Sequence, residues 1–139
     1  MKKSGRVFLL CGFLVLTAAG MASGAGMKPG LWEINSTMEM PGLPFQPPPT
    51  TITHCYTSED VKNNEKMVPQ QQGDCKVTEY KSTGNKMTWK IVCTGEQKGS
   101  GSGEMTFKGD SAYEGMMTFR TEEMSMTSRY KARRLGDCK

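Results

Sequence analysis

Two cysteines placed symmetrically about a glycine constrain the fold of this chain more than any other feature. They bound the segment DCKVTEYKSTGNKMTWKIVC, in which Cys75 and Cys93 lie equally far from Gly84. Apolar and polar residues alternate on both sides of the glycine, which is typical of β-strands with one buried face. The segment therefore predicts a β-hairpin with a turn at Gly84 and with both cysteines on its apolar face.

The register of this hairpin decides whether its cysteines can form a disulfide. With a turn centred on Gly84, Cys75 and Cys93 are directly opposite each other. Their Cβ atoms then lie about 4.5 to 5.5 Å apart, slightly wider than a disulfide prefers. A two-residue turn on Gly84 and Asn85 would shift the register by one position. We expect the Cys75–Cys93 disulfide.

The N-terminal segment, residues 1–25, predicts a cleaved secretory signal peptide. MKKSGR is basic, VFLLCGFLVLTAA is apolar, and GMASGAG supplies small residues for cleavage after Ala22 or Ala25. The apolar run is shorter than the roughly 18 to 20 residues of a membrane anchor. Residues 26–139 then form one domain that does not span a membrane. We expect it in the periplasm of a Gram-negative bacterium or secreted from the cell.

Four cysteines remain after cleavage, and an exported chain with four cysteines predicts two disulfides. If Cys75 pairs with Cys93, then Cys55 closes on Cys138 and ties down the C-terminal tail. Disulfides compensate for a small supply of branched aliphatic side chains. The mature chain has three leucines, three isoleucines and four valines, but ten methionines. We therefore expect a disulfide-stabilised domain whose core is rich in methionine.

Period-two alternation continues outside the hairpin and predicts five further strands. They are expected at residues 31–40, 51–57, 103–108, 112–120 and 124–132. The proline-rich segment 41–49 predicts a stiff loop and residues 95–103 a flexible connector, while Ser58 can cap a short helix that ends before Pro69. The chain is thus predicted to be all-β: an antiparallel meander of about seven strands, forming a curved sheet or a small up-and-down barrel, with one short helix.

Three segments, taken in order, resemble a known family. They are MKPGLWEINSTMEMPGLP near the start of the mature chain, the hairpin segment, and the closing RRLGDC. Together they are similar, from Met27 to Cys138, to the small exported bacterial proteins of domain-of-unknown-function family 3617. The resemblance implies an envelope or secreted location and the four-cysteine pattern, and it implies no activity.

The residues that enzymes use are scarce in this chain, and catalysis is the last of the functions that we expect. His54 is the only histidine. With Cys55 oxidised, no thiolate remains beside it to act as a nucleophile, and we expect His54 to be a half-buried strand residue. Glu122 and Glu123 fall in a predicted turn, and no glycine-rich phosphate loop precedes a helix. No cofactor is expected.

The charge of the mature chain gives no reason to expect a nucleic acid partner. Once Lys2, Lys3 and Arg6 leave with the signal peptide, the formal charge falls from +4 to +1. The basic C-terminal segment RYKARR places Arg129 and Lys131 on the outer face of a predicted strand, where we expect an ordinary solvated surface.

The methionines give the sharpest hypothesis about function. Met38 and Met40 lie on one face of a predicted strand, as do Met124 and Met126 on another. Thioethers bind soft cations such as Cu(I) or Ag(I), and His54 could complete such a site. The alternative is that these side chains fill the core in place of leucine, because they follow the apolar sides of their strands.

Three classes of function follow from these observations. The first is a non-catalytic module that binds a small apolar ligand or an envelope component. The second is a soft-metal protein, and the third is a structural or accessory protein that binds another envelope protein. A closed cavity would favour the first, converging sulfur atoms the second, and an exposed apolar patch without a cavity the third.

Overall fold

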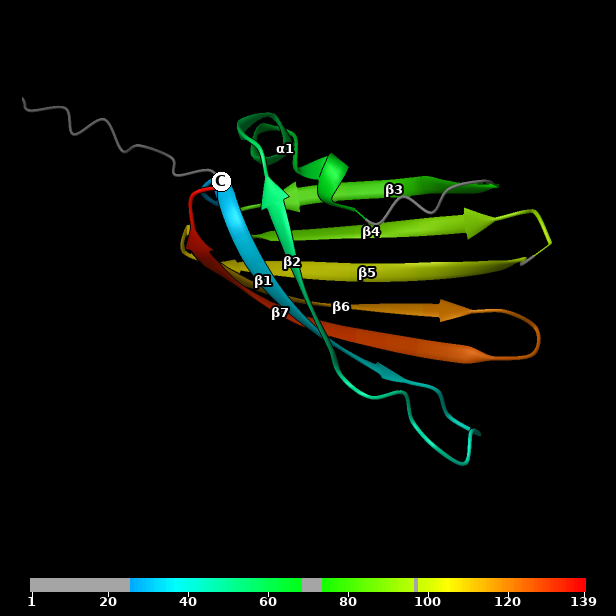
Figure 1. Ribbon diagram of the computed structural model, residues 1–139. Helices are drawn as coiled ribbons and strands as arrows, with labels where there is room; N and C mark the ends of the chain where they lie inside the picture. Colours follow the sequence, from blue (N-terminus) through cyan, green and yellow to red (C-terminus); the bar gives the residue numbers. More distant parts are fainter. Residues whose placement is uncertain (1–25, 69–73, 97) are drawn as a thin grey trace, which may run out of the picture.

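A computed structural model describes residues 26–68, 74–96 and 98–139, which form one seven-stranded antiparallel sheet (Figure 1). The predicted signal peptide lies outside the described residues. The strands are β1 (Gly30–Glu39), β2 (Thr50–Tyr56), β3 (Cys75–Thr83), β4 (Lys86–Cys93), β5 (Gly99–Lys108), β6 (Ala112–Arg120) and β7 (Ser125–Gly136). In space they follow the order β2-β1-β7-β6-β5-β4-β3.

The sheet is curved and open, so the predicted curved antiparallel sheet is confirmed and the barrel alternative is wrong. β2 and β3 are its two edge strands, and Figure 1 shows β1 and β2 crossing in front of the remaining strands. The meander is not continuous, because β1 pairs with β7 and the link from β2 to β3 runs from one edge strand to the other. A closed barrel would require these two edge strands to pair.

The link from β2 to β3 carries the predicted short helix, α1 (Ser58–Lys62), followed by a 3-10 turn, η1 (Asn64–Met67). The helix is capped by Thr57 rather than by Ser58. Thr57 Oγ1 accepts a hydrogen bond from the Asp60 N–H (3.2 Å), and the Asp60 carboxylate accepts one from the Thr57 N–H (2.8 Å). Hydrogen bonds from Thr57 also lower the pKa of Asp60, since they stabilise its charged form.

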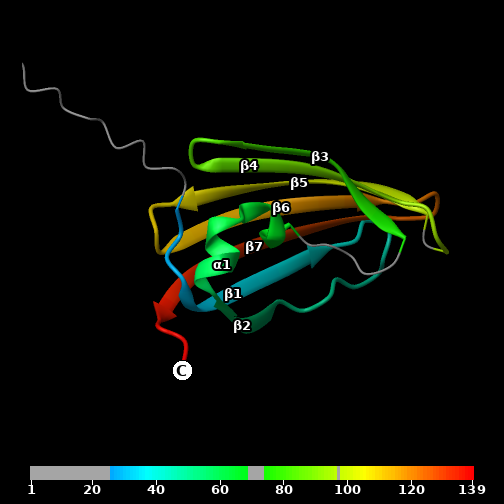
Figure 2. The same ribbon diagram turned by 90° about the horizontal axis from the view of Figure 1, so that it is seen from above.

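The core lies between this link and one face of the sheet, which we call the inner face (Figure 2). The buried side chains of the sheet are Trp32, Met87, Trp89, Ile91, Cys93, Met105, Phe107, Tyr113, Phe119 and Ala132. Val61, Met67 and Val68 pack against them from the link. The Tyr56 and Tyr113 hydroxyls share a hydrogen bond of 2.9 Å, which satisfies both groups at the edge of this apolar region.

The β3–β4 hairpin contains the Cys75–Cys93 disulfide, but its register changes along its length. The turn has two residues, Gly84 and Asn85, and Gly84 has a φ of 59°, which glycine adopts without strain. With this turn and no bulge, the register would be shifted by one residue, and Cys75 would not lie opposite Cys93. A β-bulge at Thr78 restores the alignment, so that Cys75 lies opposite Cys93. The second disulfide joins β2 to the C-terminal tail.

The GSGSG segment belongs to a strand, so the prediction of a flexible connector is wrong there. β5 begins at Gly99, and Gly99, Gly101 and Gly103 all lie on its inner face. Each glycine leaves room for a large side chain from a neighbouring strand. A Cβ atom at Gly103 would overlap the Trp89 indole, and one at Gly99 would stand 2.7 Å from Phe119 Cζ. These aromatic rings therefore lie across the glycines.

Replacing Gly103 by alanine should lower the free energy of unfolding by about 1 to 3 kcal/mol, because the new methyl group displaces the buried Trp89 ring. Urea unfolding followed by tryptophan fluorescence would measure the change. Ser102→Ala is a matched control, since Ser102 is exposed on the other face of the same strand. Its free energy of unfolding should stay within about 0.5 kcal/mol of that of the parent. Equal stability of the two variants would contradict the packing role of Gly103.

The opposite, outer face is polar, and its charges form ion pairs across neighbouring strands. Glu33 pairs with Arg133 (2.9 Å), and Glu39 pairs with Arg129 (3.4 Å), between β1 and β7. Exposed ion pairs of this kind each contribute about 1 kcal/mol or less to the free energy of unfolding. Arg129 and Lys131 of the C-terminal basic segment thus lie on the outer face, as predicted. All three arginines of the segment are paired with carboxylates, Arg134 with Asp137.

Candidate ligand-binding site

Eight of the ten methionines in residues 26–139 fall into a buried group and a partly exposed group. Met27, Met87 and Met105 are buried in the core, on the apolar sides of the segments that carry them. A second group lies at the end of the sheet where β1 and β6 finish and β7 begins. We call it the methionine surface, and it consists of Met38, Met40, Met117, Met124 and Met126.

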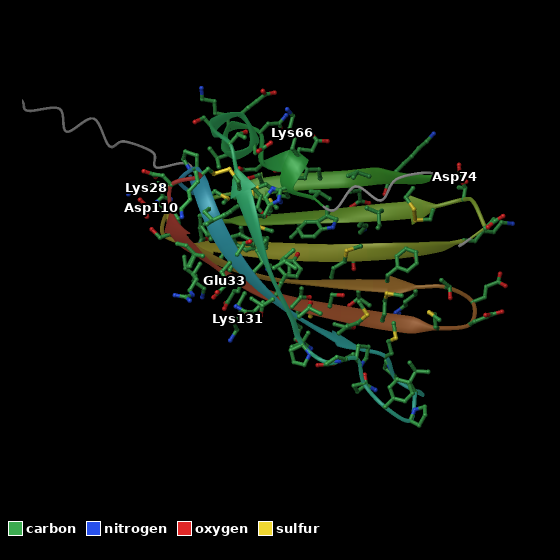
Figure 3. All side chains as sticks on the ribbon, in the orientation of Figure 1. Lys28, Glu33, Lys66, Asp74, Asp110 and Lys131 are labelled. Carbon is green, nitrogen blue, oxygen red and sulfur yellow. A yellow bond between two sulfur atoms is a disulfide. The ribbon has the colours of Figure 1, made fainter. Side chains whose placement is uncertain are left out.

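Strand register gathers part of this surface around one small residue, Ser128. Ser128 pairs with Met38 of β1 on one side and with Met117 of β6 on the other, while Met126 lies two positions earlier on the same face of β7. Diagonal neighbours on adjacent strands are about 7 to 8 Å apart, within reach of long side chains. Figure 3 shows sulfur atoms gathered over β6 and β7. Three thioethers therefore surround a position where serine occupies little space.

This arrangement differs from the predicted metal set. The predicted set has four methionines. Register brings two of them, Met38 and Met126, to Ser128, and Met40 comes directly after the end of β1. Met124 precedes β7 and is half exposed. Met117 belongs to the cluster because β6 is the other neighbour of β7, a pairing that the alternation of single strands cannot reveal.

An open cleft of about 460 Å³ borders the methionine surface, between the β6–β7 turn and the β4–β5 link. Its apolar lining comes from Phe119, Met124 and Met126. Its charged lining comes from Glu96, Lys98, Glu122 and Glu123. Glu122 and Glu123 are exposed in the turn, as predicted. The cleft thus combines an apolar wall with an excess of negative charge.

The loop between β1 and β2 projects beyond the sheet (Figure 1) and carries two exposed apolar side chains. The Gln46 side chain holds it to Met40: Gln46 Oε1 accepts from the Met40 N–H (2.7 Å), and Gln46 Nε2 donates to the Met40 carbonyl (3.1 Å). The Leu43 N–H donates to the same carbonyl (3.3 Å). Leu43 and Phe45 are nevertheless 47% and 74% exposed. The loop therefore has internal bonds but no cover for its apolar side chains.

Two buried polar atoms of the inner face lack a hydrogen-bond partner within the described part of the chain, Trp89 Nε1 and Tyr130 Oη. The Trp89 ring covers Gly103 and the Tyr130 ring covers Gly115. These glycines are diagonal neighbours on β5 and β6. Burial raises the pKa of Tyr130, so its hydroxyl stays protonated and can donate a hydrogen bond. Because both atoms are buried, they are not part of the exposed methionine surface.

His54 takes no part in the methionine surface. It lies on β2 opposite Trp32, about 20 Å along β1 from Met38 at the usual rise of a strand. The prediction of a half-buried His54 is wrong, because β2 is an edge strand and the residue is exposed; its ring meets Tyr56 edge-on, with centroids 4.5 Å apart. A metal site that combines His54 with the methionines is therefore not formed.

Among the described residues, the other polar groups give no second candidate site. No cluster of three or more His, Cys, Asp or Glu side chains in residues 26–68, 74–96 and 98–139 could hold a metal ion. A groove of about 670 Å³ on the outer face is lined largely by threonine, lysine and glutamate side chains. Two of these, Lys90 and Glu79, form an ion pair of 3.1 Å. We therefore place the candidate site on the methionine surface.

The fold and the site together define a class: a small all-β protein with two disulfides, one curved open sheet and a methionine-lined inner face. The family described as protein of unknown function (DUF3617) matches residues 27–138, and the chain belongs to this family. The resemblance carried by the three sequence segments is thereby confirmed. No curated protein and no solved structure matches the chain.

Proposed function

We propose that the protein is a non-catalytic binding module that holds an apolar ligand on its methionine surface. One observation carries this proposal: Met27, Met87 and Met105 are buried in the core, whereas the five residues of the methionine surface stay partly exposed together at one end of the inner face. Of these five, Met117 and Met126 also pack against the core, and the other three do not. Grouped apolar side chains on a surface are typical of binding sites. Methionine is flexible and polarisable, so such a surface adapts to the shape of its ligand.

The open sheet determines how a ligand would be held. The closed cavity expected for this class of function does not form, because β2 and β3 do not pair. The exposed apolar patch that is present instead also meets the criterion for the third class, a protein that binds another envelope protein. A ligand therefore lies across an open face, with the cleft beside Phe119 at one end and the loop residues Leu43 and Phe45 at the other. An extended apolar chain, such as the acyl chain of an envelope lipid, fits this surface.

We assign this activity to the periplasm or to the extracellular medium of a Gram-negative bacterium. Disulfides persist in oxidising compartments, and the protein has two. The sequence of residues 1–25 has the pattern of a secretory signal peptide. Among the described residues, no helix is both long enough and apolar enough to cross a membrane.

Binding of a soft monovalent cation is a second candidate function, favoured by the placement of Met38, Met117 and Met126 around Ser128. Thioether sulfur suits Cu(I) and Ag(I) better than it suits harder cations. Acidic side chains in the neighbouring cleft, Glu122 among them, would favour a positive charge nearby.

Fluorescence titration with N-phenyl-1-naphthylamine tests the binding of an apolar ligand. A Met38→Gln, Met40→Gln and Met124→Gln variant should bind this probe at least about tenfold more weakly than the parent, because polar amides replace the apolar contacts. The matched control changes the same three residues to leucine and should bind within about threefold of the parent. Equal binding by the glutamine variant would overturn the proposal.

Silver titration separates the second function from the first. A variant with Met38, Met117 and Met126 all changed to leucine keeps apolar volume and loses the sulfur atoms. If the parent binds Ag(I) one-to-one with submicromolar affinity and this variant folds but does not bind it, cation binding is the function of the cluster. If the two proteins respond alike to Ag(I) and both bind the apolar probe, binding of an apolar ligand remains the proposed function.

A further inference from the structure

The two edges of the sheet are built differently. β3, at one edge, carries a β-bulge at Thr78 and exposes the charged side chains of Lys76, Glu79 and Lys81. Bulges and charges along an edge strand hinder the addition of another strand, and proteins use them to prevent edge-to-edge association. The β3 edge is thus protected against pairing with a further chain.

β2, at the other edge, has none of these protections. Its pairing with β1 runs without a bulge from Gly30–Tyr56 to Ser36–Thr50. The strand TTITHCY contains no proline and no lysine, arginine, aspartate or glutamate, and every residue except Tyr56 is exposed. Figure 2 shows no other described strand beyond its free side. An unprotected edge of this kind is a template for a further strand.

The β2 edge is also held in place before any partner arrives. Thr51 Oγ1 donates a hydrogen bond of 2.7 Å to Asn35 Oδ1 on β1. At the other end of the strand, Cys55 is joined by its disulfide to Cys138, and Tyr56 shares its hydroxyl hydrogen bond with Tyr113. A strand that is already ordered loses less conformational entropy when another strand pairs with it.

The distribution of charge fits a second copy of the same chain. An antiparallel pair of identical strands has two-fold symmetry, so a charged side chain near the axis would meet its own like charge. No Asp, Glu, Lys or Arg occurs anywhere in residues 41–56. On the adjacent strand, Glu33 and Glu39 are already paired with arginines. A symmetric pair of β2 strands therefore brings no unpaired like charges together.

We propose that β2 pairs antiparallel with β2 of a second copy, which joins the two sheets edge to edge around a two-fold axis. Ile52, near the middle of the strand and 59% exposed, supplies an apolar contact across the axis. Strand addition supplies backbone hydrogen bonds along the seven residues of the edge. This pairing is independent of the methionine surface, which lies on one face of the sheet and not on its edge.

Sedimentation velocity of the oxidised protein, from about 1 to about 200 µM, tests the pairing. The parent should shift from monomer to dimer across this range. Ile52→Lys places like charges near the axis and should raise the dimer dissociation constant by at least about tenfold. Thr83→Lys is the matched control, because Thr83 is exposed on the protected edge strand β3, and it should dimerise as the parent does.

Hydrogen exchange locates the interface and keeps the proposal testable if Ile52→Lys folds poorly. Backbone amides of β2 should exchange more slowly in the parent at the highest concentration than at the lowest, whereas those of β3 should not change. A parent that stays monomeric throughout overturns the proposal and leaves β2 available for another protein. Slower exchange in β3 alone, or equal weakening by Thr83→Lys, also overturns it.

Discussion

Removal of the Cys55–Cys138 disulfide should lower the free energy of unfolding by about 4 to 5 kcal/mol, the largest effect expected of any change in this protein. The bond joins residues 83 positions apart, and the entropy that a cross-link removes from the unfolded chain grows with the length of the loop it closes. It also fastens β2, which otherwise pairs only with β1, to the tail that follows β7.

The Cys75–Cys93 disulfide provides the comparison. It joins residues only 18 positions apart, so its removal should lower the free energy of unfolding by about 3 kcal/mol. Urea unfolding of the Cys55→Ser, Cys138→Ser protein and of the Cys75→Ser, Cys93→Ser protein would measure both losses. A larger loss for the hairpin pair would contradict this ranking and would show that strain or residual structure outweighs loop length.

The hairpin shows how far local sequence rules reach. The symmetry of the cysteines predicts their pairing, and the Gly84–Asn85 dipeptide predicts a two-residue turn, yet the two rules imply registers that differ by one. A bulge at Thr78 reconciles them. The sequence contains a signal of this bulge, because the apolar residues change from odd to even positions between Val77 and Tyr80. In one short strand, such a change cannot be distinguished from an ordinary irregularity in the alternation of apolar and polar residues.

The composition of the start of β5 predicts a linker, because glycine and serine are the residues of flexible connectors. Alternation cannot be read there, since glycine has no side chain to mark the inner face. The information lies instead on the neighbouring strands, in the rings of Trp89 and Phe119 that cover Gly103 and Gly99. Complementarity of this kind depends on which strands are neighbours, and a single sequence does not state that.

The candidate site shows the same limit. Alternation correctly assigns Met38, Met117 and Met126 to the inner sides of their strands, but it says nothing about how much of the inner face is covered. That depends on where the β2–β3 link lies. The link brings Val61, Met67 and Val68 against the core, and the far end of the face keeps its methionines partly exposed. Core methionine and surface methionine therefore look alike in the sequence and differ in the fold.

Replacing Met87 by alanine should lower the free energy of unfolding by about 2 to 5 kcal/mol. Met87 is completely buried, between Ser82 of β3 and Met105 of β5, so truncation leaves a cavity that its neighbours cannot fill. Met87→Leu should cost less than about 1.5 kcal/mol, because it keeps most of the volume. What it loses is the contact between the Tyr80 hydroxyl and the Met87 sulfur, at 3.9 Å.

Met38→Ala is the informative partner of Met87→Ala. Met38 is only half buried and lies outside the set of side chains that pack against the core, so its truncation should cost about 1 kcal/mol or less. Urea unfolding of both alanine variants against the parent measures the difference. If Met38→Ala cost as much as Met87→Ala, Met38 would pack against the core as Met117 and Met126 do, and the proposed binding surface would lose its basis. A small cost for Met38 together with a large one for Met87 would mean that stability does not require methionine at position 38, which leaves ligand binding as its role.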